Sequence, residues 1–314
     1  MKFACVFPGQ GSQSIGMMAE FIERYDEVKK LFTRASDALG YDLASIIANG
    51  PVEELNKTTC TQPAMLVAGV AAWKVLRINT KLKPTLMAGH SLGEYTALVC
   101  AGALQFEDAV KLVAERGRLM QAAVPEGVGA MAAILGLDDD QVKAVCAQSS
   151  DSTSIVQAVN FNSPGQIVIA GHASAVDKAM EACKEAGAKR ALKLPVSVPS
   201  HSALMTDAAK QLGERLASIE IRTPEISVLQ NFDARAHTMP KEIAECLQKQ
   251  LYNPVLWVDT VNNLFASTGV QATVECGPGK VLVGLNKRIY KDAEHFAIDS
   301  ADNLQKFIAV LETA

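Results

Sequence analysis

A serine flanked by two glycines is the residue best placed in this sequence to do chemistry. Gly89, Ser91 and Gly93 form a Gly-x-Ser-x-Gly pattern that follows a strand-like run, residues 85–88, and precedes a helical run rich in small residues. In that setting the glycines allow a sharp turn that exposes the serine hydroxyl as a nucleophile, and the N–H of Leu92 then lies beside the oxyanion of an attacked carbonyl. The alternative is a serine that only caps the helix.

Five histidines compete for the role of general base to Ser91. We expect His90 to point away from its neighbour and to pack, while three others have turn-like surroundings: His172, His237 and His295. His201 differs, because it follows an extended, proline-containing segment and is predicted to open a helix over residues 202–218, where the chain returns from a small domain to a large one. A helix N-terminus disfavours imidazolium, so the ring would be neutral near pH 7 and able to accept a proton. We predict that His201 is the base, with a structural histidine as the alternative.

One arginine is predicted to face the protein interior. In the predicted helix 107–122 the residues three and four positions from Arg116 are all apolar: Leu112, Val113, Leu119 and Met120. A buried guanidinium needs an anionic partner, and its two parallel N–H groups suit a carboxylate. The partner is either a ligand or an internal salt bridge.

The framework that positions these residues is predicted to be α/β. Strand-like runs at residues 3–7, 85–88, 226–230 and 272–275 alternate with helical patterns, which indicates a parallel sheet wrapped by helices. The middle of the chain instead has the order βαββαβ of a ferredoxin-like unit. Its predicted elements are strand 130–135, helix 139–148, strand 155–159, turn 162–165, strand 166–170, helix 174–186 and strand 190–194. We expect a large domain of residues 1–124 and 198–314, an inserted small domain of residues 125–197, and a ligand cleft between them.

Composition narrows the class of protein. The 314 residues are 49% hydrophobic and 20% charged, which fits a globular protein that has one or two domains. The longest apolar run, residues 63–73, is too short to span a bilayer, and no signal-peptide core precedes it, so we expect a cytoplasmic protein without a membrane partner. A net charge of −4 argues against nucleic-acid binding. Seven scattered cysteines without a CxxC pair are expected to be buried thiols, with no metal site.

The first strand runs into a glycine-rich turn, VFPGQGSQ at residues 6–13. Gly9 and Gly11 fit a dinucleotide-binding fingerprint, but Ser14 stands where its third glycine would be. A tight turn between a strand and a helix is the better interpretation of the turn by itself. Two local basic clusters, within residues 189–193 and 287–291, are either solvated surface or a docking site for an acidic partner protein.

Six sequence blocks in order along nearly the whole chain resemble those of the acyltransferase family, and specifically of the bacterial malonyl-CoA:acyl carrier protein transacylases. The blocks are FPGQGSQ at 7–13, TQPA at 61–64, GHSLGEY at 89–95, SVPSH at 197–201, QLYNPVLW at 250–257 and GPGKVL at 277–282. The resemblance implies an α/β-hydrolase-like domain with a ferredoxin-like insertion. It also implies transfer of a malonyl group from malonyl-CoA to the thiol of acyl carrier protein through a malonyl-serine, for fatty-acid biosynthesis.

The same resemblance implies roles for residues that the patterns alone leave unassigned. Gln10, in FPGQG, is expected to place its backbone N–H with that of Leu92 around the oxyanion. The main-chain carbonyl of Gln250 is expected to orient His201 in place of an acidic residue, which stabilises imidazolium less than a carboxylate would.

For substrate binding, the resemblance implies that Arg116 grips the free malonyl carboxylate and that Met120 and Gln62 contact the substrate. No cofactor is expected, because the coenzyme A thioester is a substrate. The alternatives are a serine esterase or thioesterase, an acyltransferase of other acyl specificity that serves polyketide synthesis, and a non-catalytic module that binds acyl carriers.

Overall fold

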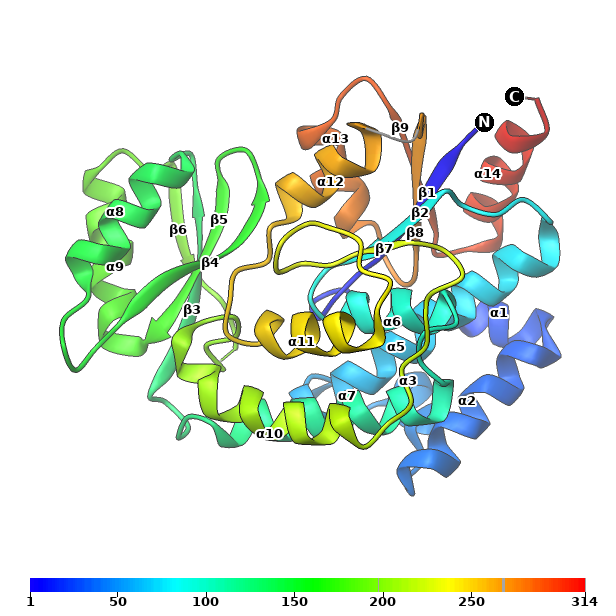
Figure 1. The fold of residues 1–314 in the computed structure, drawn as a ribbon, viewed down its shortest axis with the longest axis horizontal. Helices are drawn as coiled ribbons and strands as arrows, with labels where there is room; N and C mark the ends of the chain where they lie inside the picture. The colour runs from blue at the N-terminus through cyan, green and yellow to red at the C-terminus, as the bar shows by residue number, and fades with distance from the viewer. Residues whose placement is uncertain (197, 267–268, 314) are drawn as a thin grey trace.

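The computed structural model describes residues 1–196, 198–266 and 269–313, so Ser197, the first residue of the SVPSH block, lies outside the described residues. Its larger sheet has five parallel strands. Figure 1 shows this sheet apart from the smaller sheet of the chain. In spatial order they are β7 Val228–Leu229, β2 Leu86–Gly89, β1 Phe3–Phe7, β8 Ala272–Cys276 and β9 Glu294–Ile298. The predicted parallel sheet is therefore confirmed, with β9 added at one edge.

Most of the chain outside the smaller sheet is helical. The helices that surround the larger sheet are α1 Ala19–Arg24, α2 Asp26–Leu39, α3 Leu43–Asn49, α4 Val52–Leu55, α5 Thr58–Asn79, α6 Leu92–Cys100, α7 Phe106–Ala122, α10 Thr206–Ala217, α11 Pro240–Gln250, α12 Trp257–Ala266, α13 Val281–Ile289 and α14 Ala301–Thr313. No helix among the described residues is long and apolar enough to cross a membrane.

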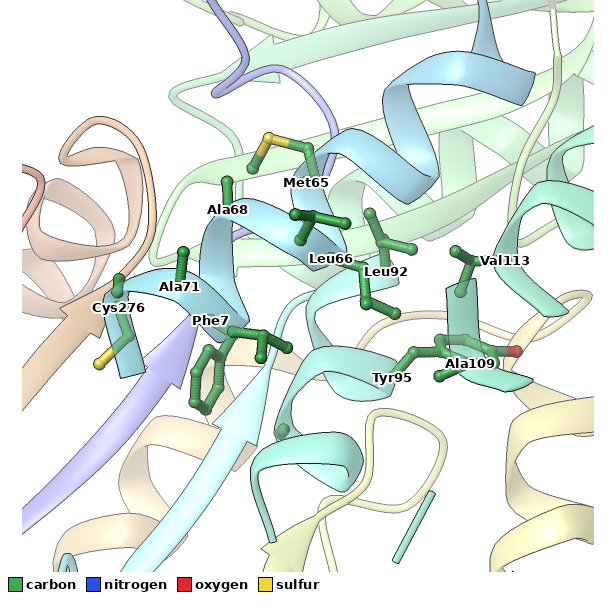
Figure 2. Packing of buried hydrophobic residues seen from close by; sticks show 14 of the residues in the cluster. Phe7, Met65, Leu66, Ala68, Ala71, Leu92, Tyr95, Ala109, Val113 and Cys276 are labelled. Carbon is green, nitrogen blue, oxygen red and sulfur yellow. The ribbon is translucent and has the colours of Figure 1, made fainter. Parts of the chain in front are cut away.

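Alternate residues of the central strand β1 enter two different cores. Phe3, Cys5 and Phe7 belong to a core with helices α2, α5, α6, α7 and α14, whereas Ala4 and Val6 belong to one with α12 and α13. This follows from the two-residue period of a strand that is covered on both faces. Figure 2 shows part of the first core, in which Leu66 of α5 lies beside Leu92 at the start of α6.

The smaller sheet has four antiparallel strands in the order β4-β5-β3-β6. Its elements are β3 Gly129–Leu135, α8 Asp139–Ser149, β4 Val156–Ser163, β5 Gln166–His172, α9 Ala173–Glu185 and β6 Arg190–Lys193. The predicted order of elements is confirmed. The predicted turn at 162–165 is too long, because β4 pairs with β5 as far as Ser163 and only two residues remain for the turn.

Helices α8 and α9 cover one face of the smaller sheet, and its other face is turned toward the larger unit. Met131, Val159 and Val168 form a small apolar cluster on that second face, with Leu194 packed beside them. Met131, Val168 and Leu194 also line a cavity that Ser91 lines from the larger unit. The two units therefore enclose the candidate site between them.

Candidate active site

The turn that carries Ser91 is shaped by close backbone packing. Ser91 has φ 51° and ψ −107° and stands between β2 and α6. A Cβ on Gly89 would lie 1.9 Å from the carbonyl carbon of Gly93, and a Cβ on Gly93 would lie 2.0 Å from the carbonyl oxygen of Phe7, so each position requires glycine. The Ser91 hydroxyl makes no capping hydrogen bond to α6, although the residue has the N-cap position. It is therefore available to the cavity.

Ser91, His201 and the main chain at Gln250 form a continuous hydrogen-bonded chain. Ser91 Oγ lies 2.8 Å from His201 Nε2, and His201 Nδ1 lies 2.7 Å from the carbonyl oxygen of Gln250. Because a carbonyl only accepts, Nδ1 carries a proton and Nε2 is free to accept the serine proton. The geometry is that of a nucleophile, a base and an orienting group.

The predicted helix 202–218 is wrong at its start. A short 3₁₀ turn, Ala203–Met205, follows His201, and α10 begins only at Thr206. His201 has φ 64°, and its N–H donates to the carbonyl oxygen of Leu251 over 3.0 Å. The ring is therefore held by the end of α11 and not by the N-terminus of a helix.

The neutrality of His201 has a different cause from the one expected. Burial, together with the positive charge of Arg116, lowers the pKa of His201 to about 3. The side chain is almost fully enclosed, at 3% exposure. Burial and a neighbouring cation, rather than a helix dipole, keep this imidazole uncharged.

Among the described residues, His201 is the histidine that hydrogen-bonds Ser91. His90 Nε2 lies 2.7 Å from Asn162 Oδ1, away from Ser91 as predicted, and His172 has the N-cap position of α9. His295 was predicted in a turn, but it lies in β9, where it bonds Thr273 and the carbonyl oxygen of Tyr290. The prediction failed because EHFAI, with a charged residue and a histidine first, lacks the apolar run of a central strand.

Arg116 is buried, as its helical position predicted, with 1% of its surface exposed. Its Nη1 donates to Gln62 Oε1 over 2.8 Å, and its Nη2 donates to Gln250 Oε1 over 3.0 Å and to Ser91 Oγ over 3.3 Å. Within the described ranges no carboxylate lies within 4.0 Å of it, and its Nε has no hydrogen-bond partner. The internal salt bridge that was the alternative for this residue is therefore not present there.

The cavity around Ser91 measures about 510 Å³. The residues of the sequence-based site that line it are Gln10, Gln62, Ser91, Leu92, Arg116, Met120 and His201. In the described part of the chain, neither the Gln10 N–H nor the Leu92 N–H donates to another protein atom. Gln62 Nε2 lies 3.4 Å from Met120 Sδ, which fixes the glutamine so that its oxygen meets Arg116.

The glycine-rich turn after β1 lies against the Ser91 turn. A Cβ on Gly9 would lie 2.6 Å from the carbonyl oxygen of His90, so only glycine lets the two turns approach this closely. Gln10, the next residue, reaches the cavity because of that approach. The tight-turn interpretation of VFPGQGSQ accounts for both observations.

Sequence reasoning missed a buried polar layer beneath Ser91. Asn231 Oδ1 accepts from the Ser91 N–H over 2.7 Å, and Asn231 Nδ2 donates to the Gly89 carbonyl oxygen over 2.7 Å. Glu94 Oε2 accepts from the Asn231 N–H and from Gln250 Nε2, which also donates to the Ser91 carbonyl oxygen. Burial raises the pKa of Glu94 to about 7. The one available signal was a glutamate inside the otherwise apolar start of α6.

A family model described as acyl transferase domain matches residues 4–306. The chain belongs to the acyl transferase family. A member of this family from Haemophilus influenzae, named malonyl CoA-acyl carrier protein transacylase, is 56% identical over 95% of both chains. The Escherichia coli (strain K12) acyl transferase of the same name is 54% identical over 92% of this chain and 93% of its own.

Solved structures of acyl transferases have the same fold. An acyl carrier protein S-malonyltransferase from Vibrio cholerae is 52% identical, with a TM-score of 0.95, over 98% of this chain and all of that one. A malonyl-transacylase in complex with its type II PKS acyl carrier protein is 49% identical, with a TM-score of 0.96, over 99% of this chain and all of that one.

Proposed function

We propose that this acyl transferase moves the malonyl group of malonyl-CoA to the phosphopantetheine thiol of acyl carrier protein, by way of a malonyl ester on Ser91. The observation that carries the acyl specificity is Arg116, a buried cation 3.3 Å from the nucleophile. Its hydrogen-bond partners among the described residues are neutral oxygens, and it lies over the ring of Tyr95. A free carboxylate on the acyl group supplies the charge that such a guanidinium lacks. The names of relatives that are 54–56% identical agree with this assignment.

In the proposed acylation, His201 Nε2 takes the Ser91 proton as Oγ attacks the thioester carbonyl. The oxyanion accepts hydrogen bonds from the N–H groups of Gln10 and Leu92. When the intermediate collapses, the C–S bond breaks, and His201 returns its proton to the departing coenzyme A thiolate. In the second half-reaction the carrier thiol gives its proton to His201 and attacks the ester carbonyl. The C–O bond to Ser91 then breaks, and His201 returns the proton to Ser91 Oγ.

In this proposal, different residues around the acyl group bind the malonyl carboxylate, position the guanidinium and fix the tautomer of His201. Arg116 binds the malonyl carboxylate through its guanidinium, and Gln62 holds that guanidinium in place while Met120 packs against Gln62. The carbonyl oxygen of Gln250 fixes the His201 tautomer. These steps use protein groups alone, with coenzyme A as a substrate and not a cofactor.

We further propose that residues 125–197 form a ferredoxin-like domain inserted into an α/β-hydrolase-like domain of residues 1–124 and 198–314. The βαββαβ order and the antiparallel strand order β4-β5-β3-β6 support the first assignment. The turn from β2 through Ser91 into α6, in a parallel sheet, supports the second. Cytoplasmic location remains a prediction from the sequence.

The proposed function is tested by intact mass after mixing with malonyl-CoA. We expect a malonyl adduct on the wild-type protein, its discharge by holo acyl carrier protein, and no adduct on Ser91→Ala. An adduct on Ser91→Ala would refute the nucleophile, and discharge to water at the same rate as to the carrier would favour a thioesterase. A neutral ester is the control substrate, since an esterase would hydrolyse the neutral ester faster than the esterase would react with malonyl-CoA.

A further inference from the structure

Away from the acyl cavity, three side chains with different donor atoms converge between the loop after β7 and helix α11. The carboxylate of Asp233, the imidazole of His237 and the thiol of Cys246 place one donor atom each within 4.8 Å of one another. His237 Nε2 lies 2.8 Å from Asp233 Oδ2. Cys246 is buried, and the other two are partly exposed, so the cluster has a protected side and an open side.

We propose that Asp233, His237 and Cys246 form a binding site for Zn²⁺. Thiolate, imidazole and carboxylate together are a zinc donor set, whereas Mg²⁺ and Ca²⁺ take oxygen ligands. Tetrahedral Zn²⁺ would separate these donor atoms by about 3.3 to 3.5 Å, which requires Asp233 and His237 to part slightly and leaves the fourth position to water. The two anionic ligands balance the charge of the dication.

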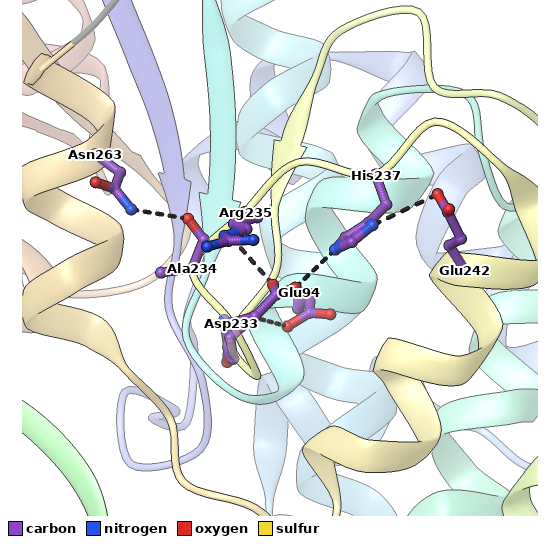
Figure 3. Close-up of polar contacts among 8 residues, drawn as sticks. Glu94, Asp233, Ala234, Arg235, His237, Glu242 and Asn263 are labelled. Carbon is purple, nitrogen blue, oxygen red and sulfur yellow. Dashed lines mark hydrogen bonds and ion pairs between the residues drawn. The ribbon is translucent and has the colours of Figure 1, made fainter.

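A second carboxylate is placed to orient the imidazole. His237 Nδ1 lies 3.5 Å from Glu242 Oε2, on the opposite side of the ring from Asp233, as Figure 3 shows. With the Nδ1 proton donated to Glu242, Nε2 is left with a lone pair for the metal, which is the usual outer-shell arrangement of a zinc histidine. Glu242 and Cys246 are four residues apart and so share one face of α11.

The local charge favours a cation. The carboxylates of Asp233 and Glu94 lie close enough to the Cys246 sulfur to act on it electrostatically, and the positive charge of Lys249 opposes them. A dication would neutralise these carboxylates and displace the thiol proton to solvent. The metal would also replace the proton that lies between His237 Nε2 and Asp233 Oδ2.

The loop half of the cluster is held in shape without a metal. Asp233 Oδ1 accepts from the Arg235 N–H, which leaves Oδ2 for His237. The carbonyl oxygen of Ala234 accepts from Asn263 Nδ2 in α12 over 3.0 Å (Figure 3). The ligands therefore need small side-chain movements and no refolding of the loop.

Zinc at this position would brace the two segments that hold the reacting groups. Asp233 follows Asn231, which accepts from the Ser91 N–H, by two residues. Cys246 precedes Gln250, whose carbonyl oxygen accepts from His201, by four residues on the same helix. The metal would join the loop to α11 and raise the melting temperature of the protein.

The test uses the chelator-treated full chain, with Co²⁺ as a spectroscopic probe and Zn²⁺ as the competing ion. We expect one equivalent of Co²⁺ to give a thiolate-to-cobalt charge-transfer band in the near ultraviolet that Zn²⁺ abolishes. The band should disappear in Cys246→Ser and persist in Cys183→Ser, a matched buried cysteine in α9. No band in the wild type, or an equal band in Cys246→Ser, would overturn the proposal.

Two further variants keep the proposal falsifiable if Cys246→Ser does not fold. His237→Gln alters a side chain that is 22% exposed, and it should remove both the band and the Zn²⁺-dependent rise in melting temperature. Glu242→Gln should weaken Zn²⁺ binding by about 10- to 100-fold, the usual effect of losing an outer-shell partner. Zn²⁺ affinities equal to that of the wild type in both variants would place the ion elsewhere, with the acyl transfer mechanism unaffected.

Discussion

Replacing Arg116 with alanine is the change that separates acyl recognition from acyl transfer. Arg116 is buried, and among the described residues its hydrogen-bond partners are the oxygens of Gln62, Gln250 and Ser91. Without the guanidinium, a bound malonyl group would bury its carboxylate with no cationic partner. Leaving one member of a buried charge pair alone costs about 2 to 5 kcal/mol. At about 1.4 kcal/mol per tenfold, kcat/KM for malonyl-CoA should fall by about 30- to 4,000-fold.

Acetyl-CoA provides the internal control, because its acyl group has no carboxylate that would be buried without a cationic partner. Its transfer by Arg116→Ala should be unchanged or faster, since Gln250 keeps its other hydrogen bonds, to Glu94 and to the Ser91 carbonyl oxygen. Radiolabelled transfer to holo acyl carrier protein, measured for both thioesters, gives the ratio directly. Arg118→Ala is the matched control, because Arg118 lies on the same helix but is exposed and paired with Glu115.

The result that would refute this reasoning is an equal loss with both thioesters. If malonyl and acetyl transfer fell together and Arg116→Ala also melted several degrees below Arg118→Ala, the guanidinium would serve to hold Gln62 and Gln250 in place. Malonyl specificity would then need another source in the cavity.

Two other predictions concern buried titratable groups. His201→Ala should slow acylation of Ser91 by about two to four orders of magnitude in rapid-quench measurements. Because burial lowers the pKa of His201 to about 3, the pH profile of the wild-type kcat/KM should show no acidic limb centred at pH 6.5. An unchanged acylation rate in the variant, or such a limb in the wild type, would contradict the assignment of His201 as the base. Burial raises the pKa of Glu275 from 4.5 to about 7, so the folded state holds this proton more tightly, and the stability it contributes is full below pH 4.5 and lost as pH rises through 7. Relative to Glu275→Gln, the wild type should therefore lose roughly 3 kcal/mol of unfolding free energy between about pH 4 and pH 8 in urea titrations, and parallel curves for the two proteins would show that the carboxyl is not buried in this way.

Local signals were enough to locate the proposed nucleophile and the buried cation. The Ser91 turn is encoded by glycines within two residues of it, and the inward direction of Arg116 follows from apolar neighbours one helical turn away. Each of these is a short-range consequence of backbone geometry. The parallel sheet was equally predictable, because β1 and β2 are continuous apolar runs.

Long-range contacts were not predictable in the same way. Asn231 meets the Ser91 N–H across 140 residues, and nothing near either residue indicates the pairing. His201 was selected for a helix N-terminus that lies elsewhere, and its low pKa comes from burial and Arg116, which only the assembled fold brings together. The cluster of Asp233, His237 and Cys246 likewise has no spacing signature, which is why the sequence led us to expect no metal.

The partner of His201 Nδ1 is a peptide carbonyl, and this has a consequence for how the enzyme tolerates mutation. Every amino acid carries that oxygen, so no substitution at position 250 can delete it. Alanine scanning will report only on what the Gln250 side chain does for Arg116, Glu94 and the Ser91 carbonyl oxygen. The hydrogen bond to His201 Nδ1 can be lost only when the end of α11 moves. Mutations that shift this helix are therefore the ones that should disturb the orientation of His201.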